Sequence, residues 1–234
     1  MRARERRAAL EAVQREVVAC SRCPRLVAWR ETVAREKRAA FADQEYWGRP
    51  VPAFGDLDAR VLVVGLAPAA HGANRTGRMF TGDRSGDWLF RALHDAGFAN
   101  QPTAVDRSDG LRLDDVLVTA SVRCAPPGNQ PLTSERLSCR SYLERELDLL
   151  LPRLRVIVAL GGLAWDQLLR VLRERGLAVP SPRPPFGHGV EVPIDDGPVL
   201  LASYHPSQQN TFTGTLTRPM FDRVWSRARE LLEA

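Results

Sequence analysis

The chain has 234 residues, 44% of them hydrophobic and 26% charged, a balance typical of a globular protein with one sizeable core. No apolar run approaches the roughly 18 residues of a membrane span, and the basic segment 1–7 lacks the apolar stretch of a secretory signal, so we expect a cytoplasmic protein. The 33 Lys and Arg residues outweigh 28 Asp and Glu, and this net charge of +5 is compatible with a polyanionic partner.

Two helices and a loop are expected before the first strand. Residues 5–18 carry apolar side chains at helical spacing, and a second, charged helix is expected over residues 27–41. A Cys-x-x-Cys turn, Cys20 to Cys23, separates the two helices. Residues 46–54 are rich in proline and aromatic side chains and are expected to form a loop.

The rest of the chain alternates strands with helices. Four apolar runs predict buried strands, at residues 60–65, 116–120, 156–160 and 199–203. Helices are expected from Trp88 to Gly97 with Ser85 or Asp87 as the cap, from Ser134 as the cap through Leu150, over residues 162–175, and over residues 218–232. Residues 190–194 alternate like an edge strand after a proline-rich loop at 180–185. This order predicts an α/β fold: one domain over residues 1–234, an α/β/α sandwich with a central, mostly parallel four-stranded sheet.

Polar segments follow the first and last strands of this predicted sheet. The first apolar run ends at Gly65, and the following turn, as far as Asp87, interleaves glycines with histidine, asparagine, arginine and aspartate. The last strand leads into the segment Tyr204 to Asn210, which contains His205. The carboxyl ends of parallel strands share one edge of a sheet, where binding sites commonly form, so we expect both segments to contribute to one site.

All four cysteines indicate one metal centre. They are Cys20, Cys23, Cys124 and Cys139. Disulfides are disfavoured in the cytosol, so four thiols with a Cys-x-x-Cys pair favour tetrahedral zinc or a 4Fe–4S cluster, while four unrelated buried cysteines are the alternative. Zinc modules usually use two closely spaced pairs, and 14 residues separate Cys124 from Cys139. The spacing therefore favours a structural iron–sulfur cluster.

Three features together resemble the iron–sulfur uracil-DNA glycosylases of family 5, also called type b. They are residues 65–78 with Phe80 to Asp83, the four cysteines, and residues 205–210, and the resemblance extends from Cys20 to the last helix. It implies a uracil-DNA glycosylase-like fold with a 4Fe–4S cluster on the four cysteines. It also implies a monomeric DNA repair enzyme that removes deaminated bases from double- and single-stranded DNA and leaves abasic sites. Such an enzyme would be cytoplasmic, and nucleoid-associated in a prokaryote.

The resemblance assigns roles to individual residues. Catalytic roles are expected for His205, Asn129 and Asp83; substrate binding for Gly65, Leu66, Ala67, His71, Phe80 and Asn210; and DNA contacts for Arg75, Arg78, Ser85, Ser207 and Gln208. Phe80 would stack on the flipped base, and His205 would hydrogen-bond the uracil O2 as negative charge develops there. Asn129 would hold the attacking water. Burial in the core for Phe80, a plain turn for Asn129 and solvated loop positions for Arg75 and Arg78 are the alternatives.

Two alanines depart from the wider superfamily. Ala67 stands where most branches place a water-holding Asp or Asn, a residue that family 5 also lacks. Ala120 stands where the type a enzymes carry an asparagine that reads uracil, so activity on hypoxanthine is expected beside activity on uracil. Two other functions stay open: a non-catalytic nucleic-acid-binding module with a structural metal cluster, and a small-molecule nucleoside hydrolase.

Overall fold

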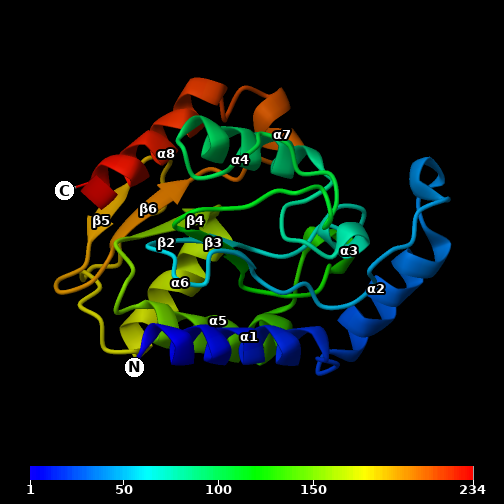
Figure 1. The fold of residues 1–234 in the computed structure, drawn as a ribbon, viewed down its shortest axis with the longest axis horizontal. Helices are drawn as coiled ribbons and strands as arrows, with labels where there is room; N and C mark the ends of the chain where they lie inside the picture. The colour runs from blue at the N-terminus through cyan, green and yellow to red at the C-terminus, as the bar shows by residue number, and fades with distance from the viewer. Residues whose placement is uncertain (234) are drawn as a thin grey trace.

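A six-stranded sheet lies at the centre of the computed structural model, which describes residues 1–233 (Figure 1). The spatial order is β1-β3-β2-β4-β6-β5. The strands are β1 (Phe54–Gly55), β2 (Val61–Gly65), β3 (Val116–Ala120), β4 (Val156–Leu160), β5 (Glu191–Pro193) and β6 (Val199–Ser203). The inner four are parallel, as predicted, and the outer two pair antiparallel. The predicted count of four strands is therefore wrong, because β1 is too short to leave a pattern and the expected edge strand β5 joins the same sheet.

Eight α-helices complete the described chain. They are α1 (Ala3–Val18), α2 (Pro24–Glu36), α3 (Ala73–Thr76), α4 (Arg84–Asp95), α5 (Thr133–Leu150), α6 (Gly162–Glu174), α7 (Gln208–Phe212) and α8 (Arg218–Glu233). Helix α2 ends at Glu36 and not at Phe41 as expected, because Lys37 adopts a φ of 55°. The cap of α4 is Asp83, and neither Ser85 nor Asp87. Ser134 lies inside the first turn of α5 and is not its cap.

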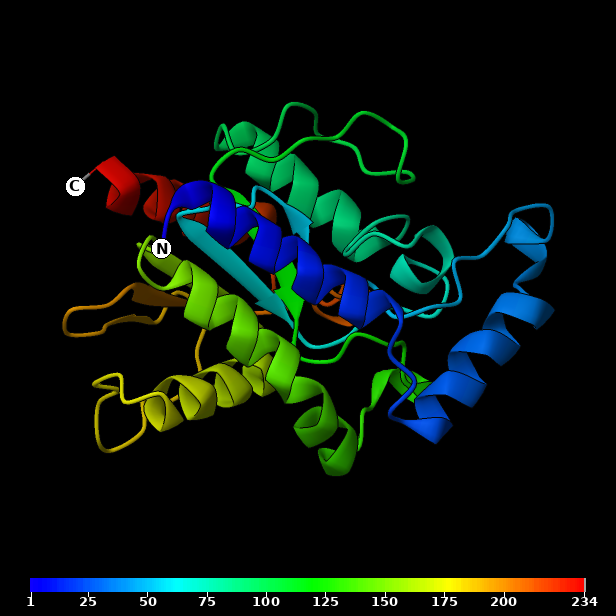
Figure 2. The same ribbon diagram turned by 60° about the horizontal axis from the view of Figure 1, so that its bottom comes forward.

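Side chains on the inner strands alternate between two apolar layers. Val61 and Val63 of β2 pack in one cluster with the apolar side chains of α4 and α8, whereas Leu62 and Val64 pack in another with those of α1, α5 and α6. A parallel sheet needs such cover on both faces. Figures 1 and 2 show α4 and α8 on one face of the sheet and α1 and α5 on the other. The predicted α/β/α sandwich is confirmed.

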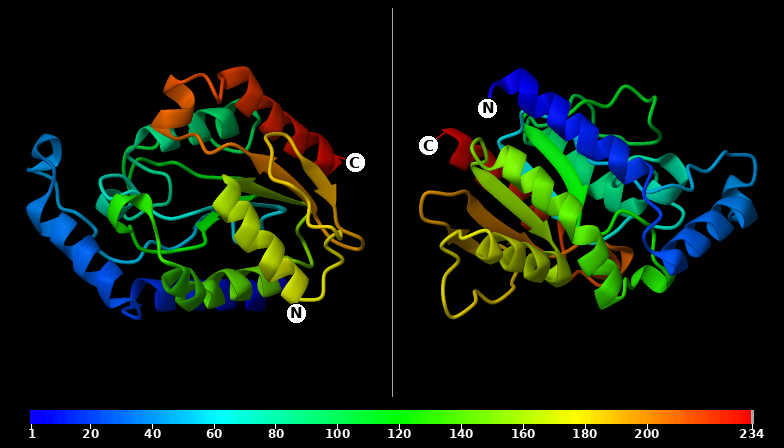
Figure 3. Two further views of the ribbon diagram at one scale, coloured as in Figure 1. Left: turned by 180° about the vertical axis from the view of Figure 1, so that it is seen from behind. Right: turned by 90° about the horizontal axis from the view of Figure 1, so that it is seen from below.

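Helix α2 lies apart from these layers. It extends beyond the sheet, on the same side of the molecule as α3 (Figures 1 and 2), and the views from behind and below agree (Figure 3). The turn between α1 and α2 contains Cys20 and Cys23. Within residues 1–233, no helix combines the length and the apolar character needed to cross a bilayer.

Candidate functional site

Loops that follow β2, β3 and β6 meet around one cavity of about 650 Å³. Connections leave the neighbouring strands β2 and β4 toward opposite sides of the sheet, the arrangement at which α/β folds bind ligands. Eight of the predicted site residues line this cavity: Leu66, Ala67, Asp83, Ser85, Asn129, His205, Ser207 and Gln208. The cavity is also lined by five residues that were not predicted from the sequence: Ala69, Arg84, Gly128, Gln130 and Gln209.

His205 lies just after β6, where burial alone lowers the pKa of its imidazole to about 4. The ring is therefore neutral at pH 7 and keeps one N–H to donate. Asn210 does not line the cavity; its side-chain amide donates to the His205 carbonyl at 2.9 Å and so closes the loop around it. The Phe80 ring stacks on the imidazole, with centroids 5.8 Å apart and planes 30° apart.

A second histidine, His188, fixes the backbone beside His205. Its Nδ1 accepts a hydrogen bond from the Tyr204 N–H at 3.2 Å, and its Nε2 lies 3.1 Å from the Met220 carbonyl, to which it donates. Burial lowers the pKa of His188, which keeps this ring neutral and able to accept. His188 was not predicted as a site residue, because it lies in an irregular segment before β5, far in sequence from any motif.

Phe80 lines a small inner pocket of about 40 Å³, together with Ala67, Asp83 and His205. Its backbone has a φ of 52°, a left-handed conformation that is unusual for an aromatic residue. Gly65 makes room for the ring, because a Cβ at Gly65 would lie 2.8 Å from it. Phe80 is half-buried and faces this pocket, although its ring also packs against the core beneath it.

Asp83 lines both cavities and also begins α4. Its carboxylate accepts a hydrogen bond from the Gly86 N–H at 3.1 Å. Burial raises the pKa of Asp83, and the backbone hydrogen bonds oppose that change only partly. A Cβ at Gly72 would lie 2.0 Å from a carboxylate oxygen of Asp83, so glycine is required there.

Asn129 ends a short 3-10 turn, Pro127–Asn129, after β3. Its φ is 58°, a conformation that asparagine tolerates better than most residues, and its side chain is exposed at the cavity. Asn129 therefore forms a turn, as the alternative expected. It also lines the cavity, where its predicted role is to hold the attacking water.

Three predicted binding residues lie elsewhere. His71 is half-buried, and its Nδ1 lies 3.1 Å from the Tyr46 hydroxyl. Arg75 is 9% exposed and donates to the carbonyls of His71 and Gly82, each at 2.8 Å. Arg78 is 4% exposed, and its guanidinium is held by a carboxylate. Arg75 and Arg78 were expected to contact phosphate or, as the alternative, to be solvated. Side chains as buried as these fit neither expectation.

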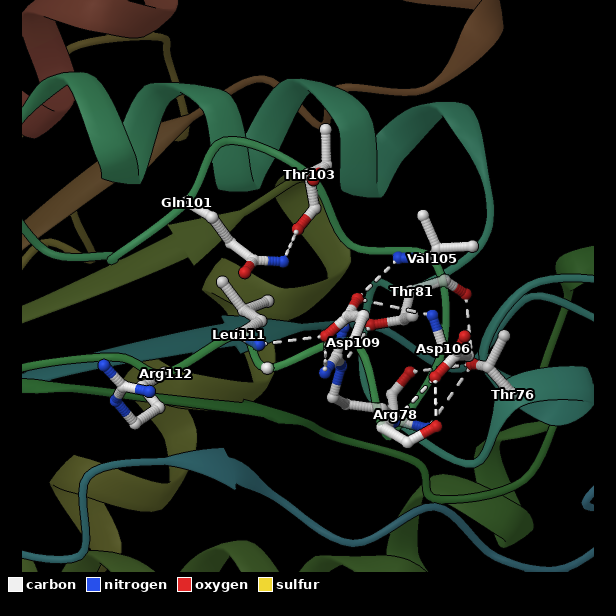
Figure 4. Close-up of polar contacts among 12 residues, drawn as sticks. Thr76, Arg78, Thr81, Gln101, Thr103, Val105, Asp106, Asp109, Leu111 and Arg112 are labelled. Carbon is white, nitrogen blue, oxygen red and sulfur yellow. Dashed lines mark hydrogen bonds and ion pairs between the residues drawn. The ribbon is translucent and has the colours of Figure 1, made fainter.

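Figure 4 shows how Arg78 is held. Its Nη1 and Nη2 donate to the two carboxylate oxygens of Asp109 at 2.8 and 2.6 Å, and its Nε donates to the Thr81 hydroxyl at 2.9 Å. Asp109 also accepts from the backbone N–H groups of Val105 and Leu111. Hydrogen bonds from Arg78 and these amides hold the pKa of Asp109 well below its usual range, although burial opposes them.

An exposed aromatic residue adjoins the cavity. Phe212, at the end of α7, is 68% exposed, and the Arg84 guanidinium lies 4.3 Å from its ring centroid. Helix α7 was not predicted, because residues 208–212 carry no apolar periodicity. The start of this helix could have been predicted from Ser207, a typical cap residue, whose hydroxyl accepts a hydrogen bond from the Asn210 N–H at 3.3 Å.

The four cysteines gather in one corner between α1, α2 and α5. All four line a cavity of about 20 Å³, where Cys124 and Cys139 are buried and Cys20 and Cys23 are half-buried against them. Burial raises the pKa of Cys124 to about 11 and that of Cys139 to about 12. Within residues 1–233, no three histidine, cysteine, aspartate or glutamate side chains are grouped so as to hold a single metal ion.

Two buried arginines adjoin these thiols. Arg30 donates to the Cys124 sulfur at 3.0 Å, and the backbone N–H of Arg123 donates to the Cys139 sulfur at 3.3 Å. The Nε of Arg30 and the Nε and Nη1 of Arg123 have no hydrogen-bond partner among residues 1–233. Arg30 is thus a buried cation with a spare donor beside the thiols, which fits an anionic centre bound by thiolates, whereas the Arg123 guanidinium is paired with the buried Glu146 carboxylate.

The fold and cavity match a known class of protein. Residues 52–229 match the family model of the uracil DNA glycosylase superfamily, and the chain belongs to this superfamily. The chain is 57% identical, over 91% of its length and 78% of theirs, to the type-5 uracil-DNA glycosylases of Mycobacterium tuberculosis and Mycobacterium bovis. It is 52% identical to that of Thermus thermophilus, over 94% of this chain and 97% of the relative.

Proposed function

We propose that this protein removes uracil from DNA by hydrolysing the N-glycosidic bond, which leaves an abasic site. One observation carries the proposal: a half-buried, neutral His205 stacked with Phe80 in a cavity at the carboxyl edge of the sheet. The relatives named type-5 uracil-DNA glycosylases support the same substrate. As a DNA repair enzyme, it would work where the DNA is, in the cytoplasm at the nucleoid of a prokaryote.

The site residues divide the work as follows. A base flipped out of the DNA enters the larger cavity and meets the Phe80 ring where the inner pocket adjoins it, and the neutral His205 donates a hydrogen bond to the uracil O2. The bond between C1′ and N1 then breaks with its electron pair on the base, where the hydrogen bond from His205 stabilises the developing charge. Water held near Asn129 bonds to C1′ and releases its proton to solvent, from which the departed uracil anion is protonated. Asp83 is a second polar group available to this water, and Ser85, Ser207 and Gln208 are available to the DNA strand around the cavity.

A wider base range is part of the proposal. Ala120, at the end of β3, is buried in the core and lines neither cavity, and it has no side-chain group that could hydrogen-bond a base edge. A pocket without such a reader cannot strongly reject a base of similar shape, so we extend the proposal to hypoxanthine.

An iron–sulfur cluster on the four cysteines is also proposed. When bound, it would join the turn between α1 and α2 to the start of the segment after β3 and to α5. Each thiolate of a 4Fe–4S cluster binds a different iron, and the place of all four cysteines around one small cavity supports a cluster that uses all four. The spare donor of Arg30, whose guanidinium contacts the Cys124 sulfur, supports its negative charge.

An excision panel tests the proposed function. The protein is incubated with duplexes containing uracil, hypoxanthine, xanthine or thymine, and with free deoxyuridine, followed by alkali to cleave abasic sites. We expect the fastest cleavage with the uracil duplex, slower cleavage with the hypoxanthine duplex, and negligible turnover of deoxyuridine. No cleavable product from any duplex would favour the inert binding module, and deoxyuridine turned over as fast as the duplex would favour a nucleoside hydrolase.

A further inference from the structure

The Phe80 turn has a conformation that its own residues do not favour. Residues 78–81 form a tight turn closed by a hydrogen bond from the Thr81 N–H to the Arg78 carbonyl at 3.3 Å. Phe80 occupies its third position with a φ of 52°, where glycine or asparagine is the usual residue. Such backbone strain persists only where the surrounding structure holds it.

Arg78 joins both ends of this turn. From the first position, its Nε donates to the hydroxyl of Thr81 at the last position. The same hydroxyl donates to the Met79 carbonyl at 3.2 Å, and the Thr76 hydroxyl donates to the Thr81 carbonyl at 3.1 Å. The turn is therefore fixed by side-chain hydrogen bonds beside the single backbone bond.

Asp109 anchors the arginine from a different segment. It pairs with the guanidinium through both carboxylate oxygens. The same oxygens accept hydrogen bonds from the backbone N–H groups of Val105 and Leu111, which fixes the 105–111 loop around Asp109 (Figure 4). The Gly82 N–H donates to the Ala104 carbonyl at 3.1 Å, so this loop also holds the residue after the turn. A bidentate pair of this kind fixes geometry as well as charge.

We propose that Arg78 and Asp109 are positioning residues that hold Phe80 in its left-handed conformation against His205, so that the base pocket exists before the base arrives. The inference rests on the proposed function. Neither side chain lines the inner pocket, so both act through Phe80 and not on the base. A pocket formed in advance speeds the chemical step by presenting the base to His205 in the productive geometry.

A double-mutant cycle tests this coupling. Single-turnover excision of uracil duplex, with enzyme in excess and long time courses, is compared for wild type, Arg78→Lys, Phe80→Gly and the double variant. Lysine keeps the charge but cannot donate to both Asp109 oxygens and Thr81 in fork geometry. Phe80→Gly removes both the ring and the strain. We expect Arg78→Lys to slow excision about tenfold in the wild-type background and less than about twofold in the Phe80→Gly background.

Controls separate positioning from general loss of structure. Arg60→Lys, at the bidentate pair with Asp115 beside the amino end of β2, should leave the rate within about twofold. Duplex affinity should be unchanged in Arg78→Lys, because the loss belongs to the chemical step. If Arg78→Lys does not fold, Asp109→Asn takes its place in the same cycle. Equal rate losses in both backgrounds, or no loss in either, would overturn the inference; no excision by wild type would instead overturn the proposed function.

Discussion

His205 lies in surroundings that keep its imidazole uncharged. Burial lowers its pKa to about 4, against about 6.5 for an unperturbed histidine. The proposed hydrogen bond to the base uses a neutral ring, as a preorganised donor whose charge state does not change near neutral pH. This separates His205 from a histidine that would work as an imidazolium.

We predict a pH profile from this pKa. The excision rate should not fall through protonation of His205 between pH 7 and 5, and it should fall as the pH approaches 4. Because the unfolded chain binds more protons between about pH 6.5 and 4, the free energy of unfolding should decrease as the pH falls through this window. Single-turnover rates and denaturant unfolding of wild type and His205→Gln check both parts. A rate midpoint near pH 6.5 that His205→Gln abolishes would contradict the account.

Arg78 illustrates the limit of prediction from sequence at this scale. A loop arginine beside other polar residues fits a phosphate contact or a solvated position equally well. Its burial is decided by Asp109, 31 residues away in a loop without periodicity. His205 was predictable for the opposite reason, since its place follows from the end of a clear apolar strand.

At the scale of elements, strand ends determine the site. The four inner strands have apolar runs that predict their positions, and parallel pairing brings their carboxyl ends to one edge. The short elements were not predictable from periodicity: β1, α3 and α7 have two, four and five residues. Their positions depend on tertiary contacts and caps, which is why no helix was predicted at α7.

Asp83 allows a prediction that separates a helix cap from catalysis. Asp83→Ala removes the cap of α4 and should lower the free energy of unfolding by about 1 kcal/mol, whereas Asp83→Asn keeps a capping oxygen and should change it little. If the carboxyl also acts in excision, both variants should lose excision rate. Denaturant unfolding and single-turnover assays make the comparison, and an Asp83→Asn variant with the wild-type rate would leave Asp83 as a cap only.

At the scale of the whole molecule, the cysteine corner joins parts that the sheet does not. Cys20 and Cys23 follow α1, while Cys124 follows β3 and Cys139 lies in α5. Helix α2 lies outside the three layers (Figure 2), so a cluster in this corner would stabilise its attachment.

We predict that Cys124→Ser loses the cluster and lowers the melting temperature, while Ala19→Ser, an exposed neighbour of Cys20, changes neither. The wild-type protein should be brown and contain about four irons and four sulfides per chain, as measured by metal and acid-labile sulfide analysis. A colourless wild-type protein that holds stoichiometric zinc would contradict the iron–sulfur proposal.

Single-turnover excision of a uracil-containing duplex by His205→Ala tests the central claim most directly. The matched control is His94→Ala, because His94 lies on α4 with 41% of its side chain exposed. We predict that His205→Ala binds the duplex but loses about 100-fold or more in rate, the loss typical of removing one donor to a developing anion, while His94→Ala stays within about twofold. An unchanged rate in His205→Ala would contradict the account.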